Sequence, residues 1–372
     1  MNIAALWILT SVLTVASSQE PDPLAKEAAK DIELGKEYIA ELDKTLKFTE
    51  NKEIIERVER IGQSLAKVAN ENHIEATYGD KRHFKFEYTF KVIEDKNVNA
   101  FSVPGGFIYV DTGLLNFVES DDELAAVLAH EIAHAANRHM ITILRERSKV
   151  NMWTVPLVIA ALLSRTREAA AAAITGQLVQ EALTSGWSQQ AELDADRAGF
   201  FYLTHSSYNP VAMLTVLERL EYRERFGPKQ ELGIERTHPP SFLRLDAIRK
   251  MLKEKNIPIA RSKVTTTFRA KYSSSDDGIV VSFGKRELFH LRGEKAEERA
   301  KEATEKLNEF FDSSPNLFEV AVRDTRVLGK GKTLVEFLPE DSKPGLNPES
   351  LAKLASDAIK NALFSLSVRT GG

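Results

Sequence analysis

The chain has no cysteine among its 372 residues. Disulfide bonds, thiol catalysis, cysteine-ligated zinc and lipid attachment at an amino-terminal cysteine are therefore excluded. The chain also lacks a strong charge imbalance, because its formal net charge is −4 and acidic and basic residues are interspersed. We expect no nucleic-acid partner, since proteins of that kind gather basic residues on one face. The composition, 43% hydrophobic and 28% charged, is typical of a globular chain of about two domains.

No apolar run reaches the roughly 20 residues that span a bilayer. The first run extends from Ile3 to Ala16 and is followed by small residues and then by charged ones. This pattern predicts a cleavable signal peptide at residues 1–18, although a basic segment before the run is missing. The mature protein is then exported to the periplasm or another extracytoplasmic space. A membrane anchor is the alternative.

A second apolar run covers residues 152–163 and is also too short to cross a membrane comfortably. We predict that it packs over a cleft, where it acts as a lid. Peripheral contact with a membrane surface is the alternative.

The first part of the chain is predicted to be helical and then to form a small sheet. Apolar residues recur at helical spacing within residues 23–46 and 51–71. Apolar and polar residues alternate in residues 83–95, which is typical of a half-buried strand.

A second strand-like segment, residues 99–115, is interrupted by Pro104, Gly105 and Gly106. Such residues belong on an edge strand or a bulge rather than on a central strand. An edge strand beside a cleft can bind an extended peptide as an added strand, so we predict that Gly105, Gly106 and Phe107 contact substrate. A plain loop before a strand is the alternative.

The segment HEIAHAANRH, residues 130–139, places His130 and His134 four residues apart, with Glu131 directly after the first histidine. Acidic residues just before an alanine- and leucine-rich stretch predict that the motif lies on a helix. Histidines four apart on a helix share one face and can reach a single metal ion. Glu131 can then take a proton from a zinc-bound water that attacks a carbonyl carbon. The polar face of an ordinary helix is the alternative.

Two histidines are too few ligands for zinc. The longer pattern with a third histidine six residues after His134 fails, because Met140 occupies that position. His139 is one residue out of register, and we interpret it as a polar residue of the helix face. The inverted order, H-x-x-E-H, is also absent.

A second segment of helical pattern supplies further ligands. Glu192 and Asp196 lie four residues apart, so one carboxylate can bind zinc while the other hydrogen-bonds a ligand histidine. Glu181 and Asp194 are competing acidic candidates, but Asp194 faces a different side of the helix. An acidic helix face without metal is the alternative.

Four motifs together, HEIAHAANRH, QQAELDADRAG, NAFSVPGGFIYVDTGLL and THPPSFLR, resemble those of the CAAX-prenyl-protease-related zinc metallopeptidases, which include HtpX-like and BepA-like secreted proteins. The resemblance covers about residues 25–255. Gln189 departs from the family, in which arginine is common at this position. That departure concerns the periphery of the site rather than zinc ligation.

The resemblance implies one zinc ion per chain, bound by His130, His134 and Glu192, with Glu131 as the base. It places Asp196 where the family has an aspartate that supports the site and is sometimes assigned as proton donor. The substrates that it implies are misfolded or misassembled envelope proteins.

The motif THPPSFLR contributes His238 and Arg244. In similar proteins the histidine lies near the metal, where it can take the fourth coordination position, and the arginine lies near the cleft. Either residue could stabilise the oxyanion of the attacked carbonyl. A proline-stiffened turn before an amphipathic helix, residues 242–254, is the alternative.

These observations predict an α+β protein: a signal peptide (1–18), a mainly helical zincin domain with a small sheet (19–255) and a small α+β accessory domain (256–372). Within this domain, the serine- and threonine-rich residues 262–278 are expected to form a linker or an irregular edge. The domain is expected to bind an envelope protein. The predicted function is zinc-dependent hydrolysis of peptide bonds. The alternative is a latent or non-cleaving zinc-binding chaperone or adaptor.

Overall fold

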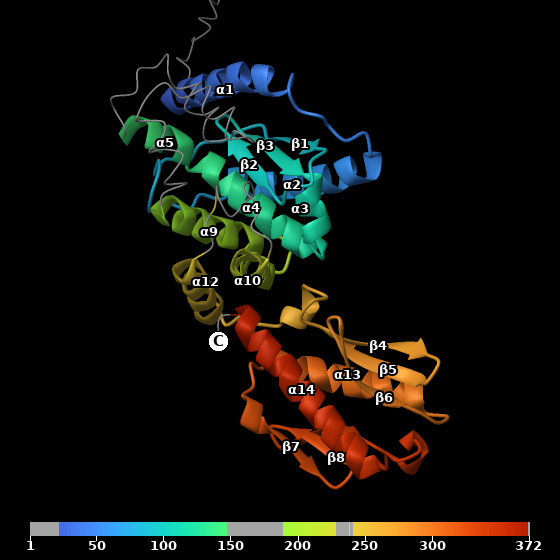
Figure 1. Cartoon of the computed structure of the whole chain (residues 1–372). Coiled ribbons are helices and arrows are strands. Elements are labelled where there is room, and N and C mark those ends of the chain that lie inside the picture. Colours follow the sequence, from blue (N-terminus) through green and yellow to red (C-terminus); the bar gives the residue numbers. More distant parts are fainter. Residues whose placement is uncertain (1–21, 147–188, 228–237, 239–240, 371–372) are drawn as a thin grey trace, which may run out of the picture.

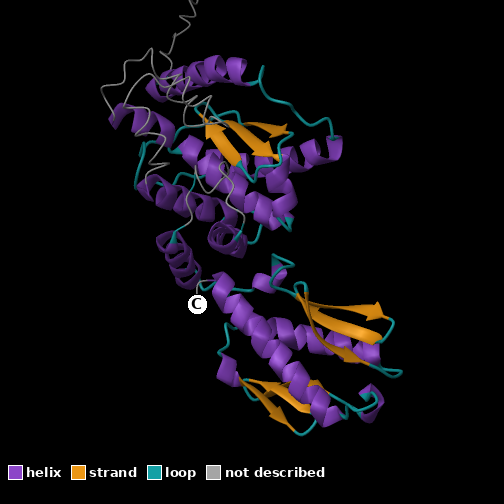
Figure 2. Cartoon of the chain, in the orientation of Figure 1, coloured by secondary structure: helices purple, strands orange, loops and turns teal. Residues whose placement is uncertain are grey.

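The computed structural model describes residues 22–146, 189–227, 238 and 241–370 (Figure 1). The predictions about the signal peptide, residues 152–163 and Glu181 lie outside these ranges. Figure 2 shows that the described chain combines many helices with three small sheets, which confirms the predicted α+β class. Apolar side chains form two clusters in the amino-terminal part and one in the carboxy-terminal part.

The amino-terminal part contains a three-stranded sheet surrounded by helices. In chain order the elements are α1 (Pro23–Leu42), α2 (Lys52–Glu71), β1 (Thr89–Ile93), β2 (Ala100–Val103), β3 (Phe107–Asp111), α3 (Thr112–Phe117), α4 (Asp121–Ala136), α5 (His139–Glu146), α9 (Gln189–Thr204), α10 (Val211–Phe226) and α12 (Phe242–Glu254). The predicted helices at residues 23–46 and 51–71 are confirmed as α1 and α2. In Figure 1 α1 lies on one side of the sheet, while α2 and α4 lie on the other.

The sheet order is β1-β3-β2, with β1 parallel and β2 antiparallel to β3. Pro104, Gly105 and Gly106 form the turn between β2 and the central strand β3, so the alternative of a plain loop before a strand is confirmed. The predicted contact of Gly105, Gly106 and Phe107 with substrate stays a prediction. Phe107 pairs with Thr89 on one side and with Val103 on the other. The two edge positions belong to β1 and β2, and the glycines allow the chain to reverse direction between β2 and β3.

Helix α1 covers the glycine turn. A Cβ atom on Gly105 would lie 2.6 Å from Cα of Ile32, and one on Gly35 would lie 2.0 Å from the carbonyl oxygen of Pro104. Glycine at both positions lets the helix and the turn approach each other closely, and both Gly105 and Gly106 have a φ of 90°. The turn is buried, and the absence of side chains at its glycines allows α1 to pack directly against it.

The carboxy-terminal part has two helices that contact two small antiparallel sheets. Its elements are η2 (Arg261–Lys263), β4 (Ala270–Ser275), β5 (Gly278–Phe283), β6 (Arg286–Leu291), α13 (Ala296–Asp312), η3 (Leu317–Glu319), β7 (Val320–Arg323), β8 (Arg326–Gly329), β9 (Lys332–Glu336), η4 (Pro339–Asp341) and α14 (Pro348–Thr370). Within the segment expected to be a linker or an irregular edge, residues 262–278, six residues form β4, which pairs with β5 along its whole length.

Buried ion pairs connect the two parts. Glu218 of α10 accepts hydrogen bonds from Arg261 at 2.7 and 2.8 Å, and from Arg249 of α12 at 3.2 Å. Arg249 also donates to the carbonyl oxygen of Thr370 at the end of α14. Within the described ranges, none of the helices combines the length and apolar character needed to cross a bilayer.

Candidate metal centre

The close packing of α4 against α9 positions the ligands of the metal centre. The side chain of Ser120 accepts a hydrogen bond from the backbone N–H of Glu123 and so caps the start of α4. The acidic residues in the first turn interact favourably with the positive end of the helix dipole. The facing side chains are small. A Cβ atom on Gly199 would lie 3.1 Å from the backbone of both Ala129 and His130. The glycine therefore lets α9 bring its carboxylates to the histidine face of α4.

Four buried side chains converge at this contact: His130 and His134 from α4, Glu192 from α9, and His238 from the segment before α12. Their ligand atoms all lie within 4.8 Å of one another. His134 Nε2 lies 3.0 Å from His130 Nε2 and 3.3 Å from Glu192 Oε1. His238 Nδ1 lies 3.0 Å from Glu192 Oε1 and 3.3 Å from His130 Nε2.

These separations fit a single tetrahedral ion. Zinc binds nitrogen and oxygen at about 2.0–2.2 Å, so neighbouring ligand atoms of a tetrahedral site are about 3.3–3.5 Å apart. Three imidazoles and one carboxylate are a donor set that zinc accepts. Without a cation, several lone pairs would face one another in a buried space, which is unfavourable.

Glu131 lies next to this group and is completely buried. Neither of its carboxylate oxygens accepts a hydrogen bond within the described chain. Oε1 lies 3.4 Å from His238 Nε2. A buried carboxylate without donors is costly, and active sites are where such groups are found.

Asp196 and Arg244 support the ligands from behind. Asp196 Oδ1 lies 3.0 Å from His130 Nδ1, so it can accept the N–H of that ring and leave Nε2 free for a metal. Arg244 donates twice to Asp196, at 2.7 and 2.8 Å, and lies 2.8 Å from Glu192 Oε2. These contacts indicate that Arg244 positions both carboxylates. The oxyanion role of its guanidinium stays a prediction.

The surrounding charges move the pKa values of the ligands. Burial by itself lowers the pKa of His130, but the Asp196 and Glu192 carboxylates raise it to about 9. Burial lowers the pKa of His134 well below its ordinary value. For Glu192, burial favours the neutral form, but the neighbouring His238 and Arg244 outweigh it and the pKa falls well below the ordinary range. Metal binding then displaces a proton from His130, because a ligand imidazole is neutral.

The interpretation of His139 as a polar helix-face residue is wrong. Arg138 has a φ of 53°, so α4 ends before it and His139 begins α5. The ring is completely buried, with Nδ1 2.9 Å from His134 Nδ1 and Nε2 3.1 Å from Asp194 Oδ2. Asp194 faces away from the metal ligands, as predicted, and also accepts a hydrogen bond from Thr77 Oγ1 at 2.6 Å.

Sequence reasoning missed this second chain of contacts behind the ligands. It runs from His134 through His139 to Asp194. Arg138 and His139 at the end of the motif could have indicated these contacts. Helical periodicity could not show that α4 ends before Arg138 and that α5 starts in a new direction.

A small cavity of about 40 Å³ opens beside the ligands. Its apolar wall comes mostly from α10, and its polar side includes His130 and Arg244. The apolar residues are Ala126, Val127, Met213, Val216, Leu217 and Leu220.

A helix with two histidines and a glutamate, joined by a carboxylate from a second helix, is the arrangement of a metallopeptidase of the zincin class. Comparison with known families agrees: residues 56–252, more than half of the chain, match peptidase family M48. The chain belongs to this family, which confirms the resemblance seen in the sequence. Residues 280–365 match a domain of unknown function, DUF8459.

Three curated proteins illustrate the similarity. The beta-barrel assembly-enhancing protease of Escherichia coli K12 is 28% identical over 214 residues, which cover 56% of this chain and 41% of that protein. A putative beta-barrel assembly-enhancing protease of Vibrio cholerae is 34% identical over 164 residues, covering 42% and 32%. The mitochondrial metalloendopeptidase OMA1 of Schizosaccharomyces pombe is 32% identical over 175 residues, covering 46% and 48%. The chain thus spans about a third to about a half of the length of these relatives.

Proposed function

We propose that this protein is a zinc-dependent endopeptidase. The observation that carries the proposal is the convergence of His130, His134 and Glu192 beside Glu131, a buried carboxylate whose oxygens accept no hydrogen bond within the described chain. The three residues would hold the ion, and Glu131 would act as the base.

Bound zinc would supply Lewis acidity, which makes water more acidic and polarises a carbonyl group. The residues of the chain perform the proton transfers. Glu131 takes a proton from the attacking water and later donates it to the leaving amine. Asp196 holds the ring of His130 through Nδ1, and Arg244 fixes the orientation of Asp196.

The test combines casein hydrolysis with metal analysis of the purified chain. Wild type should contain about one zinc per chain and cleave casein. Glu131→Gln should keep the zinc but lose activity by about 10²–10⁴-fold, because the amide cannot accept the proton. Glu53→Gln, an exposed residue of α2, is the matched control and should behave as wild type.

A Glu131→Gln variant that cleaves as fast as wild type would exclude this residue as the base. A chain that contains no zinc after purification with added zinc would exclude the metal centre itself.

A latent peptidase or zinc-binding adaptor is the second candidate, and the position of His238 favours it. Its Nδ1 completes the group of four ligand atoms, and its Nε2 lies 3.4 Å from the base Glu131. In this arrangement His238 occupies the place that the attacking water needs. His238→Ala should then raise casein hydrolysis above that of wild type, whereas lower hydrolysis would assign His238 to the reaction itself.

We propose further that the protein is exported and acts on misfolded or misassembled envelope proteins. The similarity to the beta-barrel assembly-enhancing proteases supports this substrate class. The carboxy-terminal part is proposed to bind an envelope partner. Cell fractionation and crosslinking of the full chain against a variant lacking residues 256–372 would test the location and the partner.

A further inference from the structure

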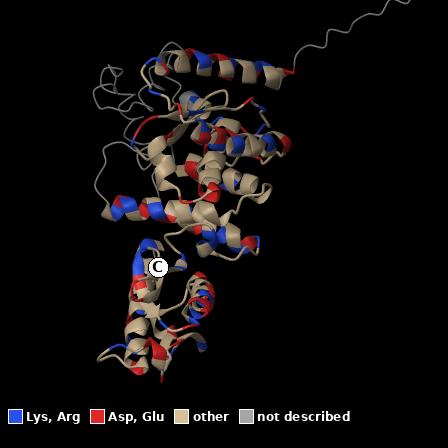
Figure 3. Cartoon of the chain, turned by 90° about the vertical axis from the view of Figure 1, so that its right-hand side faces the viewer, with Lys and Arg blue, Asp and Glu red and all other residues tan. Residues whose placement is uncertain are grey.

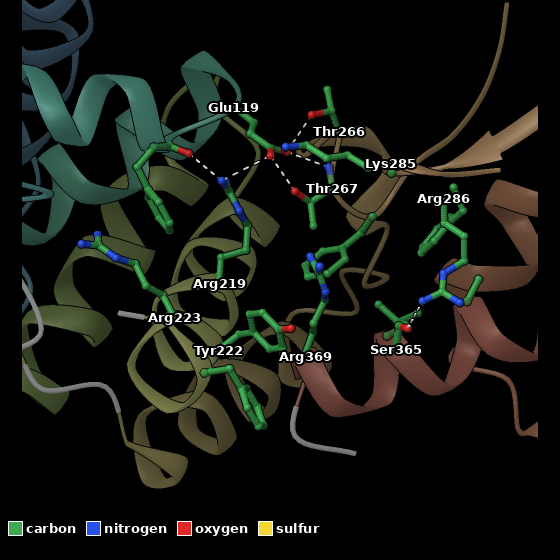
Figure 4. Close-up of a pocket in the computed structure, with 18 of the residues that line it drawn as sticks. Glu119, Arg219, Tyr222, Arg223, Thr266, Thr267, Lys285, Arg286, Ser365 and Arg369 are labelled. Carbon is green, nitrogen blue, oxygen red and sulfur yellow. Dashed lines mark hydrogen bonds and ion pairs between the residues drawn. The ribbon is translucent and has the colours of Figure 1, made fainter. Parts of the chain in front are cut away.

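A second and larger cavity lies between the two parts of the chain, away from the metal ligands (Figure 4). Its volume is about 740 Å³. The walls come from α10 and the segment after α3 on one side, and from β5, β6 and α14 on the other. A space of this size can hold a small organic ligand.

The cavity is strongly basic. Six cationic side chains line it and only one carboxylate among the lining residues opposes them, that of Glu119. The cations are Arg219, Arg223, Lys271, Lys285, Arg286 and Arg369. Figure 3 shows basic residues on both sides of the junction, near the carboxyl end of the chain. The chain as a whole has a net charge of −4, so composition alone does not explain this local excess.

The carboxylate of Glu119 already accepts hydrogen bonds from neighbouring groups. Its oxygens accept hydrogen bonds from the hydroxyl groups of Thr266 and Thr267 at 2.8 and 2.6 Å and from the backbone N–H of Thr267 at 2.7 Å. Arg219 lies 3.3 Å from the same carboxylate and also pairs with Glu123. Figure 4 shows these contacts at one end of the cavity. Glu119 and Arg219 therefore neutralise each other.

Besides Arg219, and Arg223, whose guanidinium lies 6.0 Å from the centre of the Phe117 ring, four further cations line the cavity. Lys271 and Lys285 are exposed. Arg286 donates to Ser365 Oγ at 3.1 Å, and the guanidinium of Arg369 lies 4.7 Å from the centre of the Tyr222 ring. Within the described chain none of the four forms an ion pair, so their charges are available to a ligand.

Aromatic side chains border the same space. Phe117, Tyr222 and Phe226 face it from the amino-terminal part, and Phe268 and Phe283 from the carboxy-terminal part. Phe226 is 58% exposed, which is unusual for so large an apolar side chain. The cavity thus offers cations and apolar rings together.

We propose that this cavity binds a phosphate ester that carries an apolar group. A phosphate monoester has a charge of about −1.5 to −2 and three strong acceptor oxygens, so it can pair with several cations at once. A single carboxylate would leave most of the four cations unpaired. The apolar group would contact Tyr222 and Phe226. The ester can be a soluble molecule or the headgroup of a phospholipid.

Two binding measurements on the full chain separate these sources. The first is calorimetric titration with phenyl phosphate, and the second is flotation with phosphatidylcholine vesicles that contain phosphatidic acid, a phosphate monoester, compared with vesicles of phosphatidylcholine alone. At least one phosphate ester should bind saturably. The double variant Lys285→Gln/Arg369→Gln should bind at least tenfold more weakly, and added salt should weaken binding by wild type.

A second double variant, Lys271→Gln/Arg286→Gln, removes the other two charges and should show the same loss. Lys301→Gln, an exposed lysine of α13, is the matched control and should bind as wild type. Thermal unfolding of each variant verifies that the fold is retained. Binding of phenyl phosphate alone supports a soluble ester, and binding to vesicles that contain phosphatidic acid alone supports a lipid headgroup. The proposal is overturned if neither probe binds saturably, or if both folded double variants bind as tightly as wild type.

Discussion

His139 Nδ1 lies 2.9 Å from His134 Nδ1, and both rings are buried. If His134 binds metal through Nε2, its Nδ1 carries a hydrogen and donates to His139. His139 then donates from Nε2 to Asp194. This hydrogen bond fixes the tautomer and the orientation of the His134 ring.

His139→Ala should therefore weaken metal binding by about 10–100-fold, because the ligand ring loses the partner that holds it. Competition with a chelator of known affinity measures the change. His205→Ala removes an exposed histidine from the end of α9 and should leave metal affinity unchanged. Equal zinc affinity of His139→Ala and wild type would contradict the positioning role.

Arg244→Gln should destabilise the chain by about 3–5 kcal/mol, because the buried carboxylates of Asp196 and Glu192 lose a charged partner. Urea unfolding of the metal-free chain measures the change. The comparison is Lys306→Gln, whose ion pair with Glu302 is exposed and should contribute less than about 1 kcal/mol. A similar small effect for both variants would show that Arg244 is not important for stability.

Gly199→Val should move α9 away from α4, since even a Cβ atom would lie 3.1 Å from the backbone of Ala129 and His130. We expect a loss of about 1–3 kcal/mol in stability, together with weaker zinc binding. Gln190→Val, on the exposed start of α9, is the control for the change in side-chain type. If Gly199→Val bound zinc as wild type does, close approach of the helices would not be required for the site.

The junction between the two parts should be sensitive to acid through Glu119. Burial favours a higher pKa, but hydrogen bonds from Thr265 and Thr267 and the charge of Arg219 lower the pKa of Glu119 from 4.5 to about 2. A lowered pKa stabilises the folded state above pH 4.5, and this stabilisation is lost as the pH falls toward 2. It corresponds to roughly 3 kcal/mol at neutral pH.

Glu119→Gln should therefore be about 2–3 kcal/mol less stable than wild type at pH 7, with a difference that shrinks as the pH falls below 4.5. Unfolding by urea at several pH values measures this. Glu305→Gln, an exposed residue of α13, should show no such dependence. A constant difference across this pH range would contradict the role of the charge.

Local patterns in the sequence determined the helices and most of the ligand set. The four-residue spacing within α4 and within α9 predicted which side chains share a face, because helical periodicity depends on neighbours along the chain. The same reasoning placed the strand at residues 89–93 within an alternating segment, although residues 83–88 before it are not in a strand. It also predicted that Asp194 lies on a different face of α9 from Glu192.

The tertiary structure alone decided how distant segments meet. His238 reaches the ligands although it lies 108 residues from His130, and a positive φ at Arg138 turns His139 toward His134. The order of the three strands made β3 central, and the contact of α10 with α14 created the basic cavity. None of these follows from periodicity, because each depends on packing between residues that are far apart in the sequence.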